Sequence, residues 1–246
     1  MTLSVAVGVA TMWKDPTSPR PLDEWAVADE PDLTAWVRAM TGAEASTGLH
    51  GRAETQLLRG EPVEVILDAD EWSRVVAPWQ PKIGTEGGYP GWVRRSHLSA
   101  EPADGYPPRR DAAVLDEARR FMGVRYVWGG LSEHGVDCSG LVHLSFRRLG
   151  IAVPRDAADQ CDHTSTEPIA LDEVRPGDLY FFAREGRPVH HVGFVTAPVA
   201  ADGTRLMLHA PEGSQVIEEK MSPERKAQLV SAGRVRSAGS TAGSPR

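Results

Sequence analysis

A stretch rich in proline and polar residues, at positions 101–109, separates two parts of this chain that differ in the spacing of their apolar residues. Before it, runs of β-branched and aromatic residues at 62–67 and 72–77 alternate with turn residues, which is typical of strands. After it, apolar residues recur at helical spacing in 111–122 and 138–149. The break itself has the composition of a linker. We therefore expect two domains, which agrees with a chain of 246 residues at about 150 residues per domain.

The first part, residues 1–100, is expected to form a small all-β barrel. Short strand patterns with turns about every 8–12 residues favour that architecture, and six of the seven tryptophans lie before residue 95. The apolar start of the chain, where valine alternates with smaller residues at 5–9, is interpreted as a strand. Residues 31–40 add a helical spacing within this part.

The second part, residues 110–236, is expected to be an α+β domain. Its two helical segments come first, and strand patterns follow them at residues 178–183, 191–196, 206–210 and 215–220. Helices followed by antiparallel strands are typical of that class. Gly150 follows the second helical segment and is interpreted as its C-terminal stop. Residues 237–246, rich in Ser, Ala and Gly, are predicted to be disordered.

Composition excludes several classes of protein. A net charge of −7 argues against a nucleic-acid partner, because phosphate binding needs clustered Lys and Arg. No apolar run approaches the roughly 18 residues that cross a bilayer, so we expect no membrane partner. Two cysteines rule out a disulfide-rich scaffold and a four-thiolate zinc site. The apolar N-terminal stretch has no Lys or Arg before it, unlike a secretory signal, so we expect a cytoplasmic location.

The four residues Asp137-Cys138-Ser139-Gly140 begin the second helical segment. At a helix start, free backbone N–H groups and the helix dipole favour a thiolate over a thiol, and the same groups can bind an oxyanion. Cys138 is therefore a candidate nucleophile. The alternative is a buried structural cysteine, the commoner fate of a free thiol, and position alone does not separate the two.

A nucleophilic thiol needs a base, and two histidines begin a predicted strand at His190 and His191. Side chains alternate along a strand, so one of this pair faces the cysteine helix. His209 ends another predicted strand and is a candidate to orient the base; alternatively it is a partly exposed histidine at a strand end. Cys138, one of these histidines and His209 make three potential zinc ligands, but no HExxH or CxxC pair accompanies them, so we expect no metal.

Five motifs in order resemble the NlpC-type family of papain-like bacterial cell-wall peptidases. They are Tyr126-Val127-Trp128-Gly129-Gly130, Asp137-Cys138-Ser139-Gly140-Leu141-Val142, Pro154-Arg155-Asp156, Pro176-Gly177-Asp178-Leu179 and His191-Val192-Gly193. The resemblance implies a papain-like α+β fold and no cofactor. It places the nucleophile at Cys138, the base at His191 rather than His190, a third polar residue at His209, and Tyr126 near the thiolate.

The first part resembles a bacterial SH3-like domain. Glu54-Thr55-Gln56 and Gly88-Tyr89-Pro90-Gly91-Trp92 are similar to the version that caps the cleft of murein-peptide-recycling endopeptidases. That resemblance implies that Glu54 and Tyr89 hold the free α-amine of an N-terminal L-Ala, and that Asp137 and Ser139 help to fix the substrate. Ala157 stands where the family often has a serine near the substrate.

Each of these binding residues also has a structural interpretation. Glu54 alone is typical of a solvated surface residue, and Tyr89 of packing against Trp92. Asp137 and Ser139 are typical of residues that cap a helix start.

The resemblance implies a cysteine endopeptidase that hydrolyses the bond from γ-D-Glu to a diamino acid in murein peptides with a free N-terminal L-Ala. One alternative is a secreted hydrolase or amidase that acts on intact peptidoglycan. Another is a non-catalytic protein that binds wall peptides, but the presence of both Cys138 and His191 argues against it.

Overall fold

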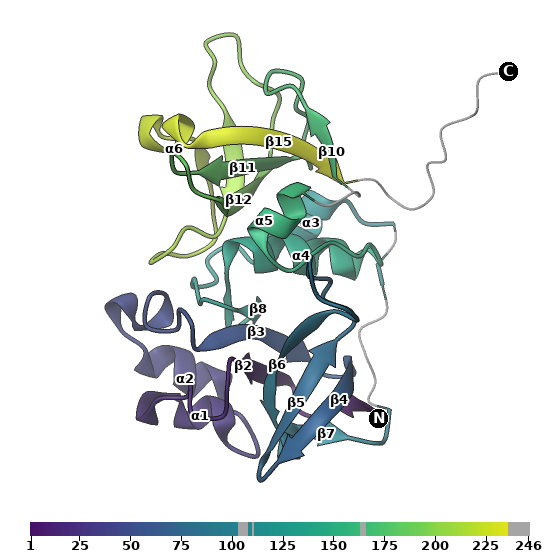
Figure 1. The fold of residues 1–246 in the computed structure, drawn as a ribbon. Coiled ribbons are helices and arrows are strands. Elements are labelled where there is room, and N and C mark those ends of the chain that lie inside the picture. The colour runs from purple at the N-terminus through teal and green to yellow at the C-terminus, as the bar shows by residue number, and fades with distance from the viewer. Residues whose placement is uncertain (103–107, 110, 163–165, 236–246) are drawn as a thin grey trace, which may run out of the picture.

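Two antiparallel sheets, with helices packed between them, make up the computed structural model of this chain (Figure 1). The structure describes residues 1–102, 108–109, 111–162 and 166–235. The predicted linker lies partly outside these residues, and the predicted disordered tail at 237–246 lies wholly outside them. Among the described residues, no helix is both long and apolar enough to cross a membrane.

The N-terminal sheet has seven strands in the order β3-β2-β6-β5-β4-β1-β7. Their bounds are β1 (Thr2–Val5), β2 (Val9–Trp13), β3 (Ala53–Leu58), β4 (Pro62–Ala69), β5 (Trp72–Ala77), β6 (Tyr89–Arg94) and β7 (Leu98–Ser99). The alternating valines at the start of the chain thus contribute to two strands rather than one. One face of the sheet buries an apolar cluster that includes Met12, Val63 and Val75.

This first part is not all-β, because helices fill the connection from β2 to β3. They are η1 (Pro21–Asp23), α1 (Glu24–Val27), α2 (Leu33–Ala39) and η2 (Gly42–Ala45). Only α2 was indicated by helical spacing; the Asp32 side chain caps it by accepting from the Ala35 N–H at 2.8 Å. The helices build a second apolar cluster around Trp13 and Trp36. The buried Asp23 carboxylate accepts from the Trp36 indole N–H at 2.8 Å. The SH3-like assignment of residues 1–100 stays a prediction.

The C-terminal sheet has six antiparallel strands in the order β10-β15-β11-β12-β13-β14. Their bounds are β10 (Thr166–Ile169), β11 (Leu179–Ala183), β12 (Val189–Val195), β13 (Leu206–His209), β14 (Ile217–Lys220) and β15 (Leu229–Val235). All four predicted strands are present. The patterns missed β10, which contains Pro168, and β15, in which small and polar residues interrupt the alternation.

Three helices of this part precede the sheet in the chain, and the fourth connects β14 to β15. They are α3 (Val114–Arg119), α4 (Cys138–Arg148), α5 (Ala157–Asp162) and α6 (Pro223–Ala227), and a small hairpin of β8 (Leu131–Ser132) and β9 (Gly135–Val136) precedes α4. The predicted helix at 111–122 is shorter than expected, because its last residues form tight turns up to Gly123, which has a positive φ of 81°.

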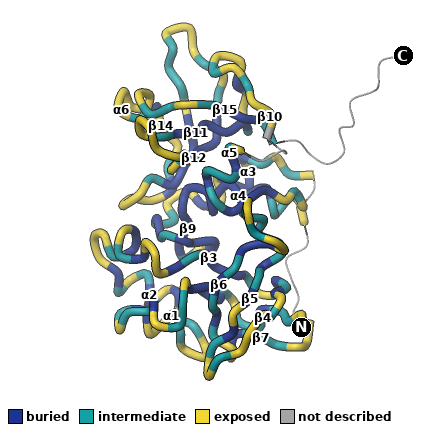
Figure 2. The backbone as a smooth tube through the Cα atoms, in the orientation of Figure 1, coloured by how far each residue is buried: buried dark blue, intermediate teal, exposed yellow. Residues whose placement is uncertain are grey.

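Helix α4 lies at the centre of the molecule, between the C-terminal sheet and the β8–β9 hairpin (Figure 1). Every residue from Cys138 to Phe146 is buried, and Figure 2 shows this continuous buried stretch. Gly140 permits the close packing: a Cβ atom there would lie 2.3 Å from the Gly130 carbonyl oxygen. Because the first turn of α4 is buried, its polar groups must find partners inside the protein or in a ligand.

Candidate active site

Cys138 is the first residue of α4 and lies against a cavity of about 950 Å³. Both parts of the chain line this cavity: Glu54 and Tyr89 come from the N-terminal sheet, and Cys138 and His191 from the C-terminal part. Cys138 is 7% exposed and His191 is 5% exposed. His190, the neighbour of His191 on β12, is exposed to solvent. The alternation along β12 therefore buries His191 at the cavity, the member of the pair that the motif selected.

Three polar side chains on neighbouring strands form a hydrogen-bonded series. His191 Nε2 lies 2.8 Å from His209 Nδ1, and His209 Nε2 lies 3.0 Å from Glu219 Oε1. A carboxylate only accepts, so His209 Nε2 carries the proton and donates to Glu219. Burial lowers the pKa of His209 to about 4, so the ring is neutral and its Nδ1 accepts from His191 Nε2–H. His191 Nδ1 is then the nitrogen that retains a lone pair.

The resting state of the reacting pair is neutral. Burial, followed by the Asp137 charge, raises the pKa of Cys138 to about 12, although the Val192 and Ser139 N–H groups lower it. Burial and the Arg225 charge hold the pKa of His191 well below its usual range. The predicted stabilisation of a thiolate at the helix start is therefore present but outweighed, because the buried thiol loses more solvation than two N–H groups restore. Cys138 must transfer its proton to His191 as it attacks.

In the first turn of α4, the Ser139 N–H interacts with the Cys138 sulfur, and the Cys138 N–H is available to an oxyanion. Asp137 Oδ1 accepts from the Gly140 N–H at 2.6 Å, which completes the helix cap. Among the described residues no backbone carbonyl or side-chain oxygen accepts from the N–H groups of Cys138 and Ser139. Tyr126 is buried beside them and lines the cavity. Burial, followed by the charges of Cys138 and Asp137, raises the pKa of its phenol, which therefore remains a hydrogen-bond donor.

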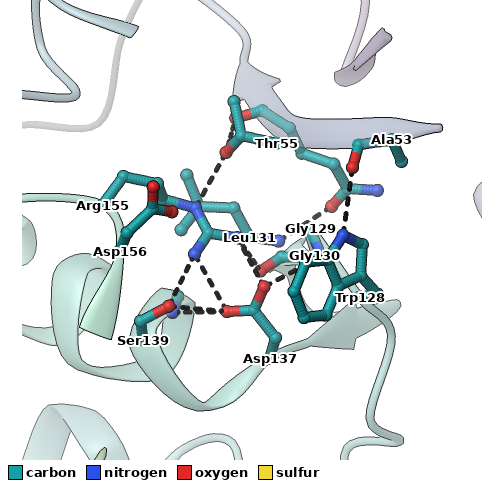
Figure 3. Close-up of polar contacts among 12 residues, drawn as sticks. Ala53, Thr55, Trp128, Gly129, Gly130, Leu131, Asp137, Ser139, Arg155 and Asp156 are labelled. Carbon is teal, nitrogen blue, oxygen red and sulfur yellow. Dashed lines mark hydrogen bonds and ion pairs between the residues drawn. The ribbon is translucent and has the colours of Figure 1, made fainter. Parts of the chain in front are cut away.

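Two of the predicted substrate-binding residues have their polar atoms engaged within the protein (Figure 3). The Asp137 carboxylate accepts from Arg155 at 2.9 and 2.8 Å and from the Gly129 N–H at 2.8 Å, besides capping α4. Ser139 Oγ donates to Asp137 and accepts from Arg155 at 3.0 Å. Both residues line the cavity, but their side chains favour the capping interpretation over direct substrate contact.

Arg155 belongs to the Pro-Arg-Asp motif, to which the sequence assigned no role, and it joins the two parts of the chain. It is 1% exposed, and its Nε donates to Thr55 Oγ1 on β3 at 2.8 Å (Figure 3). Strand β3 is an edge of the N-terminal sheet, and edge strands have unpaired polar groups. Here the C-terminal part covers that edge: Trp128 Nε1 donates to the Ala53 carbonyl oxygen at 3.1 Å, and Gln56 Oε1 accepts from the Leu131 N–H at 2.9 Å.

The covered edge brings together Glu54 and Tyr89, the two residues that the resemblance assigns to the substrate amine, and a third residue, Asp156, to which no role was assigned. The Tyr89 hydroxyl lies 3.4 Å from Glu54 Oε2 and 3.2 Å from Asp156 Oδ2. Burial and the Asp156 charge raise the pKa of Tyr89, so this phenol is neutral. Lys82 balances part of the negative charge, with its Nζ 2.5 Å from Asp156 Oδ2. Asp156 follows the Arg155 of the Pro-Arg-Asp motif, and its place beside that residue was the available signal.

A buried thiol at a helix start and an imidazole on the antiparallel sheet that packs against this helix, both lining one cavity, define a papain-like thiol hydrolase. Residues 123–234 match the NlpC/P60 family, and this part of the chain belongs to that family of cysteine peptidases.

Two curated relatives extend the similarity over both parts. A gamma-D-glutamyl-L-lysine dipeptidyl-peptidase of Bacillus subtilis is 29% identical over 89% of this chain and 93% of its own length. A protein of the same name from Bacillus cereus is 27% identical over 87% and 84%. The solved structure of an NlpC/P60 family protein from Bacillus cereus superposes with a TM-score of 0.83 at 22% identity, covering 96% of this chain and 99% of that one. The fold of the N-terminal part is therefore shared as well.

Proposed function

We propose that this cysteine peptidase hydrolyses the bond from γ-D-Glu to a diamino acid in murein peptides whose N-terminal L-Ala has a free amine. The observation that carries the proposal is that one cavity contains Cys138 and His191 together with the two carboxylates of Glu54 and Asp156. The proposal is supported by the names of the two curated relatives. It includes a cytoplasmic location, where the substrates are soluble peptides released by wall turnover.

The free amine is the group that the N-terminal sheet selects. An ammonium carries a positive charge and three donors, and removing it from water is costly without anionic partners. Glu54 and Asp156 supply the charge, and the neutral Tyr89 hydroxyl supplies a further acceptor. A hydrogen bond to a charged group contributes about 1.5–3 kcal/mol. Because Ala53 and Glu54 of strand β3 line this end of the cavity, we expect an acyl group or a muramic acid on the amine to meet protein rather than solvent.

The reaction then follows from the neutral pair. Cys138 Sγ attacks the γ-carbonyl carbon of D-Glu while its proton moves to His191 Nδ1. The carbonyl oxygen becomes an oxyanion and receives hydrogen bonds from the Cys138 N–H and the Tyr126 hydroxyl. As the carbon–nitrogen bond breaks, His191 gives the proton to the departing α-amine of the diamino acid. A water molecule then loses a proton to His191 and attacks the thioester, which releases the γ-carboxylate and restores the thiol.

His209 and Glu219 act through His191. By accepting a hydrogen bond from the Nε2–H group of His191, His209 fixes the tautomer in which Nδ1 is the base. Glu219 fixes His209 in the same way. These are positioning residues, and their role predicts a smaller loss of kcat for His209→Ala than for His191→Ala.

The decisive measurement compares kcat/KM for L-Ala-γ-D-Glu-L-Lys with that for the same peptide acetylated at its amine, with products identified by mass spectrometry. We expect cleavage at the γ-D-Glu bond and a preference for the free amine of at least about tenfold, since 1.4 kcal/mol corresponds to a factor of ten. A ratio near one would contradict the proposal and favour action on intact peptidoglycan.

A further inference from the structure

Arg225 on α6 lines the same cavity, and its guanidinium has no hydrogen-bond or ion-pair partner among the described residues. Its guanidinium lies over the Phe182 ring, with Cζ 5.5 Å from the ring centroid, and the residue is half-buried. A guanidinium has five donors and a permanent charge, so partial burial without a partner costs free energy that an anionic ligand offsets. Arg155, by contrast, has its donors engaged within the protein.

Within the part of the chain that the structure describes, no carboxylate hydrogen-bonds to Arg225. Burial lowers the pKa of Arg225, although the charge of Glu219, which does not line the cavity, acts to raise it. Glu219 accepts from His209, and Glu212 lies 3.6 Å from the His50 ring nitrogen. Glu224 interacts with the Ser222 hydroxyl and with its own backbone N–H, which lower its pKa. Glu54 and Asp156 lie together at the Tyr89 hydroxyl. The charge of Arg225 is thus left for a bound molecule.

Arg225 lies on the side of the cavity where the leaving group departs. Phe182 is paired with His191 between β11 and β12, and their ring centroids are 5.5 Å apart. The guanidinium and the imidazole therefore flank the same ring. Arg225 is also the charged group that lowers the pKa of His191 most. Because His191 protonates the departing amine, the diamino acid occupies the His191 side of the scissile bond, next to Arg225.

We infer that Arg225 binds the α-carboxylate of the diamino acid, so that the enzyme prefers peptides that end at this residue. The inference rests on the proposed function and deepens it. The departing nitrogen and this carboxylate are attached to the same α-carbon, so a carboxylate beside His191 is within reach of a neighbouring guanidinium. A planar guanidinium binds a carboxylate through two parallel hydrogen bonds. The cavity then recognises both ends of a tripeptide, with acids for its amine and an arginine for its carboxylate.

The substrate has a second carboxylate, at the α-carbon of D-Glu, with the same chemistry. It lies on the acyl side of the scissile bond, which becomes attached to Cys138 and remains after the diamino acid has left. The test must therefore use two blocked peptides. In one, the C-terminal carboxylate of L-Ala-γ-D-Glu-L-Lys is an amide; in the other, the α-carboxylate of D-Glu is an amide.

The experiment measures kcat/KM of the full chain for the unblocked tripeptide and for each amide, in wild type, Arg225→Gln, Arg225→Lys and Lys226→Gln. Lys226→Gln is the matched control, because this substitution removes the same charge from the same helix at an exposed position. We expect kcat/KM of wild type to be at least tenfold higher for the free C-terminus than for its amide. Arg225→Gln should bring this ratio of kcat/KM values near one, and Arg225→Lys should give an intermediate ratio. Lys226→Gln should keep the wild-type ratio. Thermal unfolding of each variant checks that it is folded.

Two outcomes would overturn the inference while leaving the proposed function in place. In one, wild type cuts the tripeptide but shows no preference for the free C-terminus, or Arg225→Gln and Arg225→Lys keep the wild-type preference. In the other, the Arg225 variants remove the preference for the D-Glu carboxylate instead, which would assign the guanidinium to the acyl side. Failure of wild type to cut the tripeptide at the γ-D-Glu bond would overturn the proposed function itself, and this inference with it.

Discussion

The network behind the first turn of α4 and the His191 side of the cavity are built on opposite principles, as Arg155 in the network and Arg225 at the cavity show. Each nitrogen of the Arg155 guanidinium donates within the protein, and the Asp137 carboxylate alone accepts four hydrogen bonds of 2.6 to 2.9 Å. Around His191, the series of hydrogen-bonded rings ends at Glu219. Arg225 has no hydrogen-bond or ion-pair partner among the described residues. The network is thus the closed side, which holds the molecule together, whereas the His191 side is the open side and has binding capacity left for a substrate. Lining a cavity is therefore weaker support for a binding role than an unsatisfied group is.

The closed side also explains how a fully buried charge is tolerated. Burial lowers the pKa of Arg155, but the charge and hydrogen bonds of Asp137 outweigh it and the net pKa is raised. A buried ion pair offsets its desolvation only when geometry and additional hydrogen bonds are good. The Gly129 and Gly140 N–H groups and the Thr55 hydroxyl provide those bonds (Figure 3). Because Thr55 lies on β3, the same network fixes the neighbouring Glu54 at the cavity.

The open side is tested first by Cys138→Ala, for which we expect the largest effect. Removal of the nucleophile should lower kcat by about 10⁴-fold or more, because the steps that use His191 have no thiol to act on. Turnover of the tripeptide by mass spectrometry measures this. Cys161→Ala is the matched control, since Cys161 contacts Ser231 and does not line the cavity. Equal losses in the two variants would assign Cys138 to the core rather than to the reaction.

The closed side is tested by Arg155→Met. Loss of the guanidinium leaves the buried Asp137 without its charged partner, and breaking a buried pair in this way costs about 3–5 kcal/mol of the free energy of unfolding. Urea denaturation measures the change. The control is Arg119→Met, because Arg119 and Glu218 form a similar two-bond pair at 3.0 and 3.1 Å on the exposed surface. That exposed pair contributes at most about 1 kcal/mol to the free energy of unfolding. Similar losses of this free energy in both variants would contradict the difference between the buried and the exposed pair.

Sequence patterns were sufficient for the parts of the molecule that depend on local order. The start of α4 follows from a capping Asp137 before a helical stripe, and the order of β11 to β14 follows from four separate strand patterns. The role of the Asp137 carboxylate could not be predicted in the same way. Its partner Arg155 is 18 residues away, and whether the pair is satisfied depends on β3, from the other part of the chain.

Glu219 and Arg225 were missed for a different reason. They lie on a short exposed strand and a five-residue helix, which have no motif that distinguishes them from other charged surface segments. Only the pairing of β13 with β14 brings Glu219 to His209, and only the packing of α6 over Phe182 brings Arg225 to the cavity. Lys82 also pairs with a residue far along the chain, Asp156. Charged groups of this kind become identifiable once tertiary structure shows which of them are paired.

The amine end of the cavity is tested by Glu54→Gln. The substitution keeps the size of the side chain and removes its charge, so a bond of about 1.5–3 kcal/mol to the ammonium is weakened. We expect KM for the tripeptide to rise by about tenfold or more, and the preference for a free over an acetylated amine to fall. Glu86→Gln, an exposed residue of the loop before β6, is the control. An unchanged preference would show that Asp156 and Tyr89 recognise the amine without Glu54.

The smallest expected effect is a shift in the pH dependence of kcat/KM. The base must be neutral to accept the thiol proton, so activity falls as pH decreases through the pKa of His191 in the free enzyme. Burial, followed by the charges of Arg225, His209 and His190, holds that pKa well below 6.5. The acid limb of wild type is therefore expected below pH 6.5. Arg225→Gln removes a cation that disfavours the imidazolium, which raises the pKa and moves the limb to higher pH.

The control for this shift is again Lys226→Gln, which should leave the acid limb in place because Lys226 is not among the charges that shift the pKa of His191. Measurements use a C-terminal amide substrate, so that the effect of Arg225 on the base is separated from its contact with a carboxylate. A wild-type limb at or above pH 6.5, or a shift to lower pH in Arg225→Gln, would contradict the neutral pair. It would instead indicate that the acid limb belongs to a group whose pKa is lowered neither by burial nor by the charge of Arg225.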